Sequence, residues 1–228
     1  MAELSIIIPT FNAIPVLGPT LAALAQIEAV GLVKDVVISD GGSTDDTTAA
    51  ARETGAIVVE TQRGRGPQLQ AGADAATGDW LLFLHADTVL APGWADVVRA
   101  FIARPAASEQ AGYFTFVLDD SSPQARRIER LVRWRNRVFA LPYGDQGLLL
   151  HRSLFRRIGG YRYYPLMEDV DIVHRLGRRR LRPLDGEAIT SAARYRANGY
   201  WRRPARNLCC LVLYYLGISP ETIRRIYE

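Results

Sequence analysis

Residues 81–90 read LLFLHADTVL, an apolar run that stops abruptly at a histidine, an aspartate and a threonine. A short apolar run bounded by polar residues is typical of a strand that is buried on both faces of a sheet. We therefore expect a strand over residues 80–84, with Asp87 just beyond its carboxyl end and Thr88 starting a turn. That position makes Asp87 either a turn residue or a ligand-binding group.

Segments typical of strands and helices alternate on both sides of this run. Apolar, β-rich segments are found at residues 4–8, 33–39, 57–60 and 80–84. Helical segments are expected between and after them, at 15–30, 44–53, 67–76 and 92–103. Beyond residue 110 we expect strands over 113–118, 147–151 and 182–189, and helices over 124–140, 168–180, 201–216 and 220–227. The alternation indicates βαβ units, and so an α/β fold with a doubly wound, mostly parallel sheet and C-terminal helices.

Composition limits the class of protein. The 228 residues and the formal charge of +4 fit one α/β domain with a tail. Of the 28 basic residues, Lys34 is a lysine and the others are arginines, most of which follow residue 120. This concentration of arginine suits an anionic partner such as a phosphate, a membrane surface or nucleic acid. The adjacent Cys209 and Cys210 have neither a disulfide framework nor a metal-binding spacing, so we expect buried thiols in a reducing compartment. The amino-terminal residues are unlike a signal peptide. No stretch of the sequence reaches the roughly 18 consecutive apolar residues of a membrane-spanning helix. Both observations predict a cytoplasmic protein.

Polar residues follow each of the first four expected strands. These segments are PTFN at 9–12, DGGS at 40–43, RGRG at 63–66 and HAD at 85–87. Because ligands of parallel α/β sheets bind outside the carboxyl ends of the strands, the four segments should converge on one site. Each alone could be a simple turn, and the GRGPQL segment at 64–69 lacks the third glycine of a dinucleotide fingerprint. Together, two carboxylates, two arginines, an amide and glycine-rich turns indicate a site for a phosphorylated ligand that carries a nucleotide.

Several of these segments carry a resemblance to a known family. They are SIIIPTFNA at 5–13, DVVISDGGSTDDT at 35–47, RGRGPQLQAGADAATGDWLLFLHADT at 63–88, GDQGLLLHRSLFRRIGGY at 144–161 and MEDVDIVHRL at 167–176. Over about residues 4–180 the chain resembles family 2 glycosyltransferases, which have a GT-A fold, and a compact bacterial subgroup of them. The resemblance implies an enzyme that takes a sugar from a nucleotide-diphosphate sugar.

The resemblance also implies roles for individual residues. The nucleotide sugar would be bound by Pro9, Thr10, Asn12, Asp40, Arg63, Arg65 and Ala86. Asp87 matches the last aspartate of the family's DxD element, which implies a divalent cation, Mn²⁺ or Mg²⁺, on the diphosphate. Asp169 matches the catalytic base, and the neighbouring Glu168 would raise its proton affinity. Asp145 and Gln146 would contact the donor sugar or the acceptor.

The chain departs from the family pattern at two places. His85 occupies the first position of the DxD element, so one carboxylate is lost and the imidazole is a candidate extra contact to metal or phosphate. His174, five residues after Asp169, is a second candidate of this kind or an ordinary helix residue. The QxxRW motif of processive synthases is missing, which favours the addition of a single sugar.

These features predict an inverting, metal-assisted glycosyltransferase with an unknown acceptor. A UDP-sugar is the favoured donor, a GDP-sugar is the alternative, and no nucleic acid is expected as a partner. One competing hypothesis is a polyprenyl-phosphate sugar synthase, with a phosphate site in an arginine stripe formed by Arg126, Arg130, Arg133 and Arg137. Another is a protein without catalytic activity that binds anions or membranes on the same fold.

The carboxyl-terminal segment leaves its own alternatives open. We expect a glycosyltransferase domain over residues 1–200 and a helical extension over 201–228. The extension combines arginines, aromatic residues and an apolar run. It is expected to pack on the domain, to form a homodimer, or to contact the inner face of a membrane peripherally.

Overall fold

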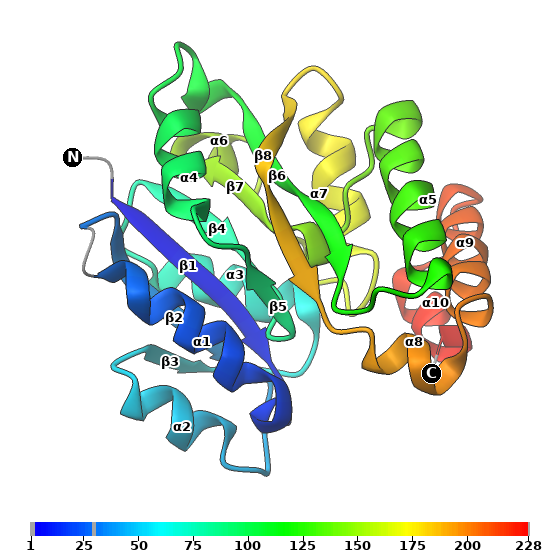
Figure 1. Ribbon diagram of the computed structural model, residues 1–228, viewed down its shortest axis with the longest axis horizontal. Helices are drawn as coiled ribbons and strands as arrows, with labels where there is room; N and C mark the ends of the chain where they lie inside the picture. The colour runs from blue at the N-terminus through cyan, green and yellow to red at the C-terminus, as the bar shows by residue number, and fades with distance from the viewer. Residues whose placement is uncertain (1–2, 29–30, 228) are drawn as a thin grey trace.

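The computed structural model describes residues 3–28 and 31–227, and these form one mixed sheet with helices on both faces (Figure 1). The sheet has eight strands in the order β3-β2-β1-β4-β7-β6-β8-β5. The strands are β1 (Leu4–Thr10), β2 (Val33–Asp40), β3 (Ile57–Glu60), β4 (Trp80–Phe83), β5 (Thr88–Leu90), β6 (Ala111–Leu118), β7 (Leu148–His151) and β8 (Leu181–Thr190).

Ten α-helices and two short 3₁₀ turns connect the strands in the described part of the chain. The helices are α1 (Ile14–Glu28), α2 (Thr47–Glu53), α3 (Arg65–Ala75), α4 (Trp94–Ile102), α5 (Pro123–Phe139), α6 (Arg152–Arg157), α7 (Glu168–Leu176), α8 (Ala193–Asn198), α9 (Arg202–Tyr215) and α10 (Pro220–Tyr227). The 3₁₀ turns are η1 (Ala107–Glu109) and η2 (Gly144–Gln146).

The strand order places a crevice at the end of β1. Strand β1 pairs in parallel with β2 on one side and with β4 on the other. Both β2 and β3 lie on the first side of β1, and all later strands lie on the second side. In doubly wound sheets the reversal of strand order opens a ligand crevice at the carboxyl ends. The segments that follow β1 and β4 are therefore brought together there, as the sequence predicts.

The apolar run at 81–84 is buried because β4 faces a core on both sides. Leu82 and Leu84 belong to one hydrophobic cluster, which α1 and α4 cover, and Leu81 and Phe83 belong to another, which α3, α6 and α7 cover. All four side chains are at most 3 % exposed. Alternate residues of a strand point to opposite faces, so a strand between two cores has to be apolar throughout.

The expected elements are found with three differences. Residues 88–90 form strand β5 rather than a turn, because Thr88 pairs with Thr190 of β8 and their hydroxyls lie 3.1 Å apart. The helix expected over 168–180 ends at Leu176, because Gly177 takes a left-handed φ of 74°. Helix α8 was not predicted. The end of the helix expected over 15–30 falls on residues 29–30, which lie outside the described residues.

The carboxyl-terminal helices pack on the domain. Cys210 of α9 and Ile223 of α10 are fully buried in the cluster that also contains α7. Cys209, by contrast, is exposed, so the expectation of two buried thiols is wrong for one of them. Among the described residues, no helix combines the length and the apolar character that crossing a bilayer requires.

Candidate active site

Two adjacent cavities lie at the carboxyl ends of the strands. The first, which we name the strand-end cavity, encloses about 1160 Å³ including its open mouth. Its lining includes Pro9, Thr10, Asn12, Arg63, Arg65, His85, Ala86 and Asp87, all of them predicted site residues. The second, which we name the Asp169 cavity, is lined in part by Arg65, His85, Asp87, Asp145 and Asp169. Arg65, His85 and Asp87 therefore form part of the wall between the two cavities.

Hydrogen bonds between loops shape the strand-end cavity. Asn12 has a left-handed φ of 47°, and its side-chain oxygen accepts a hydrogen bond of 2.8 Å from the backbone N–H of Thr44. The backbone N–H of Asn12 donates to the hydroxyl of Ser43 at 2.8 Å. These bonds tie the loop after β1 to the loop after β2 at the rim of the cavity.

Asp40 lies beneath this rim rather than in the cavity. It is 1 % exposed and does not line either cavity. One carboxylate oxygen accepts hydrogen bonds from the hydroxyls of Thr10 and Ser43, and the other accepts from the backbone N–H groups of Gly42 and Ser43. Asp40 thus has four hydrogen bonds within the protein, and in this structure it holds the loop that forms the cavity.

An aromatic ring and two arginines face the strand-end cavity. The guanidinium of Arg63 lies 4.0 Å from the ring centre of Phe11, a contact that the sequence analysis did not anticipate. Arg65, at the start of α3, lies 3.8 Å from the carboxylate of Glu168. Burial by itself would lower the pKa of Arg65, but the carboxylates of Glu168 and Asp169 outweigh burial and raise that pKa. Arg65 is therefore a fixed positive charge between the two cavities.

His85 follows the end of β4 and lies against Gly144 of η2. A Cβ atom added at Gly144 would lie 2.5 Å from Nε2 of His85, so the imidazole occupies space that only glycine leaves open. The backbone N–H of Gly144 also donates to a carboxylate oxygen of Asp169 at 3.2 Å. Gly144 thus lies between the histidine of the strand end and the carboxylate of α7.

Asp169 and Glu168 occupy different environments although they are neighbours in the first turn of α7. Asp169 is half-buried and lines the Asp169 cavity, and its other oxygen accepts from the N–H of Val170 at 2.7 Å. Glu168 is 1 % exposed and lines neither cavity. Burial, reinforced by the charge of Asp169, raises the pKa of Glu168 to about 8, although Arg65 opposes the shift. The side chain of Asp169 is therefore accessible to a ligand in this cavity, whereas Glu168 lies behind it, close to Arg65.

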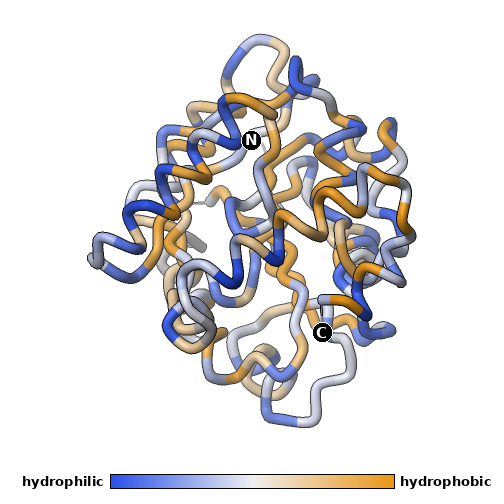
Figure 2. Tube along the Cα trace, turned by 90° about the vertical axis from the view of Figure 1, so that its right-hand side faces the viewer, coloured by the Kyte–Doolittle hydropathy of each residue, from blue (hydrophilic) through white to orange (hydrophobic). Residues whose placement is uncertain are grey.

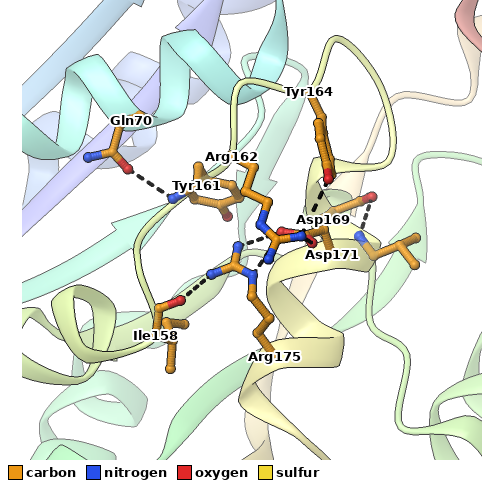
Figure 3. A network of polar contacts seen from close by, with 9 residues as sticks. Gln70, Ile158, Tyr161, Arg162, Tyr164, Asp169, Asp171 and Arg175 are labelled. Carbon is orange, nitrogen blue, oxygen red and sulfur yellow. Dashed lines mark hydrogen bonds and ion pairs between the residues drawn. The ribbon is translucent and has the colours of Figure 1, made fainter. Parts of the chain in front are cut away.

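A network of hydrogen bonds fixes the loop that leads into α7 (Figure 3). Asp171 pairs with Arg162 at 3.1 Å and with Arg175 at 2.5 Å. Arg175 also donates to the carbonyl of Ile158, and the N–H of Tyr161 donates to the side chain of Gln70 in α3 at 2.9 Å. The loop is thereby tied to α3 and to α7, which fixes the start of α7 and with it Asp169.

The same loop packs closely on the start of α3. A Cβ atom added at Gly66 would lie 2.1 Å from the carbonyl oxygen of Arg162, and the N–H of Gly66 donates to the carbonyl of Tyr164 at 3.1 Å. This close approach requires a residue without a side chain at position 66, so the RGRG segment has a packing role as well as its arginines.

Of the pair predicted to contact sugar or acceptor, only Asp145 lines the cavity. Burial raises the pKa of Asp145 to about 6, with Arg135 opposing the shift and Asp169 adding to it. Gln146 is 1 % exposed, accepts hydrogen bonds from Asn136 and Arg135, and donates to the carbonyl of Phe114. Gln146 therefore lies behind the cavity and holds Arg135, whose guanidinium lies 3.5 Å from the ring centre of Tyr143.

The carboxyl-terminal helices contribute residues that sequence reasoning did not identify. Arg203 and Asn207 of α9 line the Asp169 cavity, and Arg224 of α10 lines the strand-end cavity. Tyr227 lines both cavities, and its ring lies 4.2 Å from the guanidinium of Arg206. The concentration of arginine in this segment was a signal for such residues, but it did not indicate which of them reach the site.

Two predicted groups lie elsewhere. His174 is on the exposed side of α7 and lines neither cavity. The four arginines of the stripe on α5 are exposed and also line neither cavity, and Arg126 is bonded to Glu129 and to the carbonyl of Asp120. Within the described ranges, no three or more His, Cys, Asp or Glu side chains are grouped closely enough to hold a metal by themselves.

The family model for glycosyl transferase family 2 matches residues 5–164. A PGL/p-HBAD biosynthesis glycosyltransferase of Mycobacterium tuberculosis is 33 % identical over 181 residues, which cover 73 % of this chain and 66 % of the relative. The N-acetylglucosaminyl-diphospho-decaprenol L-rhamnosyltransferase of the same species is 25 % identical over 218 residues, covering 77 % of this chain and 70 % of the relative. The chain thus spans about two thirds of the length of the curated relatives that it matches.

Solved structures resemble the fold as a whole. The mannosyltransferase PcManGT from Pyrobaculum calidifontis, in complex with GDP-Man and Mn²⁺, has a TM-score of 0.64 and 22 % identity, with 90 % of this chain and 61 % of that chain covered. The glucosyl-3-phosphoglycerate synthase from M. tuberculosis, in complex with Mn²⁺, UDP and phosphoglyceric acid, has a TM-score of 0.57 and 20 % identity, with 80 % and 68 % covered. The fold is the GT-A fold of these glycosyltransferases. Because the family model matches more than half of the chain, we conclude that the chain belongs to glycosyl transferase family 2.

Proposed function

We propose that the protein transfers one sugar from a nucleotide-diphosphate sugar to an acceptor oxygen, with inversion at the anomeric carbon. One observation carries this proposal: Asp87 lies on the boundary of the strand-end cavity and the Asp169 cavity, and Asp169 lines the second. A donor bound in the first cavity would place its diphosphate at Asp87 and its sugar towards Asp169. The acceptor would then approach from the side of Asp169.

The strand-end cavity suits a nucleotide diphosphate in shape and charge. Phe11 offers a ring on which a base can stack, and Arg63 and Arg65 offer positive charge for the phosphates. The two solved structures described above hold UDP and GDP-Man. We propose a UDP-sugar as the favoured donor and a GDP-sugar as the alternative.

A divalent cation fits the site only as an ion shared with the donor. A Mg²⁺ ion that accompanies a nucleotide usually takes one or two carboxylates from the protein and its other ligands from phosphates and water. Asp87 supplies one such carboxylate, and His85 lies beside it in the same wall. When bound there, Mn²⁺ or Mg²⁺ would neutralise charge that develops on the leaving diphosphate.

The chain's own residues account for the remaining chemistry. The carboxylate of Asp169 takes the proton from the acceptor hydroxyl as its oxygen forms a bond to the anomeric carbon. The bond between that carbon and the diphosphate breaks, and the nucleoside diphosphate leaves with the electron pair. Arg65, whose guanidinium stays charged at any pH of interest, stabilises the departing phosphate.

The decisive experiment compares three variants with the wild type. Transfer and hydrolysis of UDP-sugars and GDP-sugars are measured with Mn²⁺ and with a chelator, and UDP binding is measured by calorimetry. We expect Asp169→Asn to lower kcat by about 10²–10⁴-fold with UDP binding retained, because the acceptor proton loses its base. We expect Asp87→Ala to weaken the Mn²⁺-dependent part of UDP binding. Asp96→Asn is the matched control, because the Asp96 side chain is 84 % exposed, pairs with Arg99 three residues along α4 and lines neither cavity.

Two results would refute the proposal. The first is a lack of binding and turnover for every sugar nucleotide with every metal, which would favour a protein without catalytic activity. The second is equal activity of Asp169→Asn and the wild type, which would remove the proposed base.

A further inference from the structure

Helices α5 and α9 are neighbours in the fold (Figure 1), and residues of both line an apolar groove beside the Asp169 cavity. Its lining includes Leu131, Trp134, Phe139, Trp201, Leu208 and Leu211, and we name it the α5–α9 groove. Figure 2 turns this side of the molecule towards the viewer, and hydrophobic and hydrophilic residues alternate along its helices.

The groove exposes large apolar side chains to solvent. Leu131 is 50 %, Trp134 53 %, Phe139 60 %, Leu208 60 % and Trp201 75 % exposed. Single exposed apolar residues are common on protein surfaces, but five large ones around one groove form a contiguous patch of the kind that marks a binding site.

The groove adjoins the Asp169 cavity. Tyr143, Tyr195 and Asn207 line both of them. The end of a molecule that lies in the groove would therefore lie beside residues that also border the cavity of Asp169. The groove is thus next to the cavity that holds the proposed catalytic carboxylate, which is where the apolar part of an acceptor would have to lie.

Positive charge lies where the groove meets the cavity. The guanidinium of Arg135 lies over the ring of Tyr143 at 3.5 Å, and that of Arg203 lies over the ring of Tyr195 at 4.8 Å. Arg135 lines the groove and Arg203 lines the cavity. A ligand that spans both would thus have an apolar part in the groove and a polar or anionic part at the two arginines.

We propose that the α5–α9 groove binds the apolar tail of an amphiphilic acceptor, a single lipid-like molecule whose polar head carries the reacting oxygen into the Asp169 cavity. This inference rests on the proposed glycosyl transfer and adds the class of acceptor to it. The head is either a hydroxyl-bearing group or a phosphate, and the test below separates these two.

The first test uses tryptophan fluorescence with model amphiphiles. Trp134 and Trp201 line the groove, whereas Trp80 and Trp94 are 5 % and 2 % exposed in the core, so a change in emission on binding reports on the groove. The probes are alkyl β-glucosides and alkyl phosphates with tails of 8 to 12 carbons, each below its micelle-forming concentration. We expect saturable binding that tightens about fourfold per methylene, because each buried CH₂ contributes about 0.8 kcal/mol. Tighter binding of the phosphates identifies an anionic head, and tighter binding of the glucosides a neutral one.

Three variants locate the binding. Leu131→Asp and Leu208→Asp place a charge in the groove and are expected to weaken the binding of the longest amphiphile about tenfold or more. Val138→Asp is the matched control, because Val138 is an exposed apolar residue of α5 that does not line the groove. All three sites are at least 42 % exposed, so the variants should fold.

The result for the groove is independent of the result for the donor. UDP binding tests the donor site and amphiphile binding tests the groove, so the failure of either is visible by itself. The proposal is overturned if no amphiphile binds, if affinity does not depend on tail length, or if Val138→Asp weakens binding as much as Leu131→Asp. Two other outcomes would also overturn it. In the first, the protein self-associates in sedimentation and the groove variants abolish this association, which would make the groove a dimer interface. In the second, the protein binds phospholipid vesicles but no monomeric amphiphile, and the groove variants abolish the vesicle binding.

Discussion

The buried carboxyl group of Glu168 makes the stability of the protein depend on pH in a way that one substitution should reveal. Glu168 is 1 % exposed, and neither of its carboxyl oxygens has a hydrogen-bond partner among the described residues. Burial raises its pKa from 4.5 to about 8. The substitution Glu168→Gln keeps the shape of the side chain and removes its titration.

The size of the effect follows from the two pKa values. Between pH 4.5 and 8 the folded protein keeps a proton on Glu168 that the unfolded chain has lost, so the free energy of unfolding falls as the pH rises. The slope approaches about 1.4 kcal/mol per pH unit, and the loss between pH 5 and pH 8 amounts to about 3 kcal/mol. The variant has no such loss, so its stability relative to the wild type should rise by about 3 kcal/mol over this range.

Urea denaturation at several pH values, followed by circular dichroism, measures this difference. The absolute stability of the variant also includes the change at Arg65, but that contribution should be nearly constant with pH because arginine stays charged. Unfolding curves of variant and wild type that keep a constant separation from pH 5 to pH 8 would refute the reasoning. They would mean that Glu168 titrates in the folded protein as it does in the unfolded chain.

Three further predictions concern the wall between the cavities and the acceptor side. Gly144→Ala should displace the ring of His85, because an added Cβ would lie 2.5 Å from its Nε2 atom. We expect kcat/KM to fall about a hundredfold in steady-state kinetics. An unchanged kcat/KM would mean that the position of His85 does not matter for catalysis. Asp145 should be protonated below about pH 6 and charged above it, so the pH profile of kcat/KM should have an inflection near pH 6. The variant Asp145→Asn should lack this inflection. The same inflection in the variant would exclude Asp145 as its source. Tyr227→Ala should raise the KM for the sugar nucleotide about two- to tenfold, because the ring lines both cavities, and an unchanged KM would place the ring outside the donor site.

The strand ends could be predicted from the sequence because periodicity determines them. The apolar runs predicted where the strands lie. Ligands of parallel α/β sheets bind at the carboxyl ends of the strands, so Asn12, Arg65 and Asp87, which follow those ends, could be expected in one cavity. The orientation of a side chain within its turn is a different matter. Asp40 follows its strand as expected, yet it turns inward to accept four hydrogen bonds from its own loop and the neighbouring one. No periodic pattern encodes that choice.

The carboxyl-terminal helices could not be placed from the sequence for a similar reason. Their amphipathic pattern fits a protein core, a partner or a membrane surface equally well. Cys210 and Ile223 pack into the hydrophobic cluster that α3, α6 and α7 also cover. This packing brings Arg203 and Tyr227 to the cavities. Such packing depends on the complementary shape of residues far apart in the chain, which one sequence does not reveal.

The position of Tyr227 has a consequence for the binding of the two substrates during turnover. Its ring belongs to the wall of both cavities, and Arg206 holds it through a hydrogen bond of 3.1 Å to the Tyr227 carbonyl. Ligands that bind in the two cavities would therefore meet a shared surface, which would link their binding equilibria. The linkage is reciprocal, because the factor by which the donor changes the affinity for the acceptor equals the factor by which the acceptor changes the affinity for the donor. With a favourable factor, the acceptor would bind more tightly to molecules already loaded with donor, and the donor more tightly to molecules loaded with acceptor, through a single shared phenol ring.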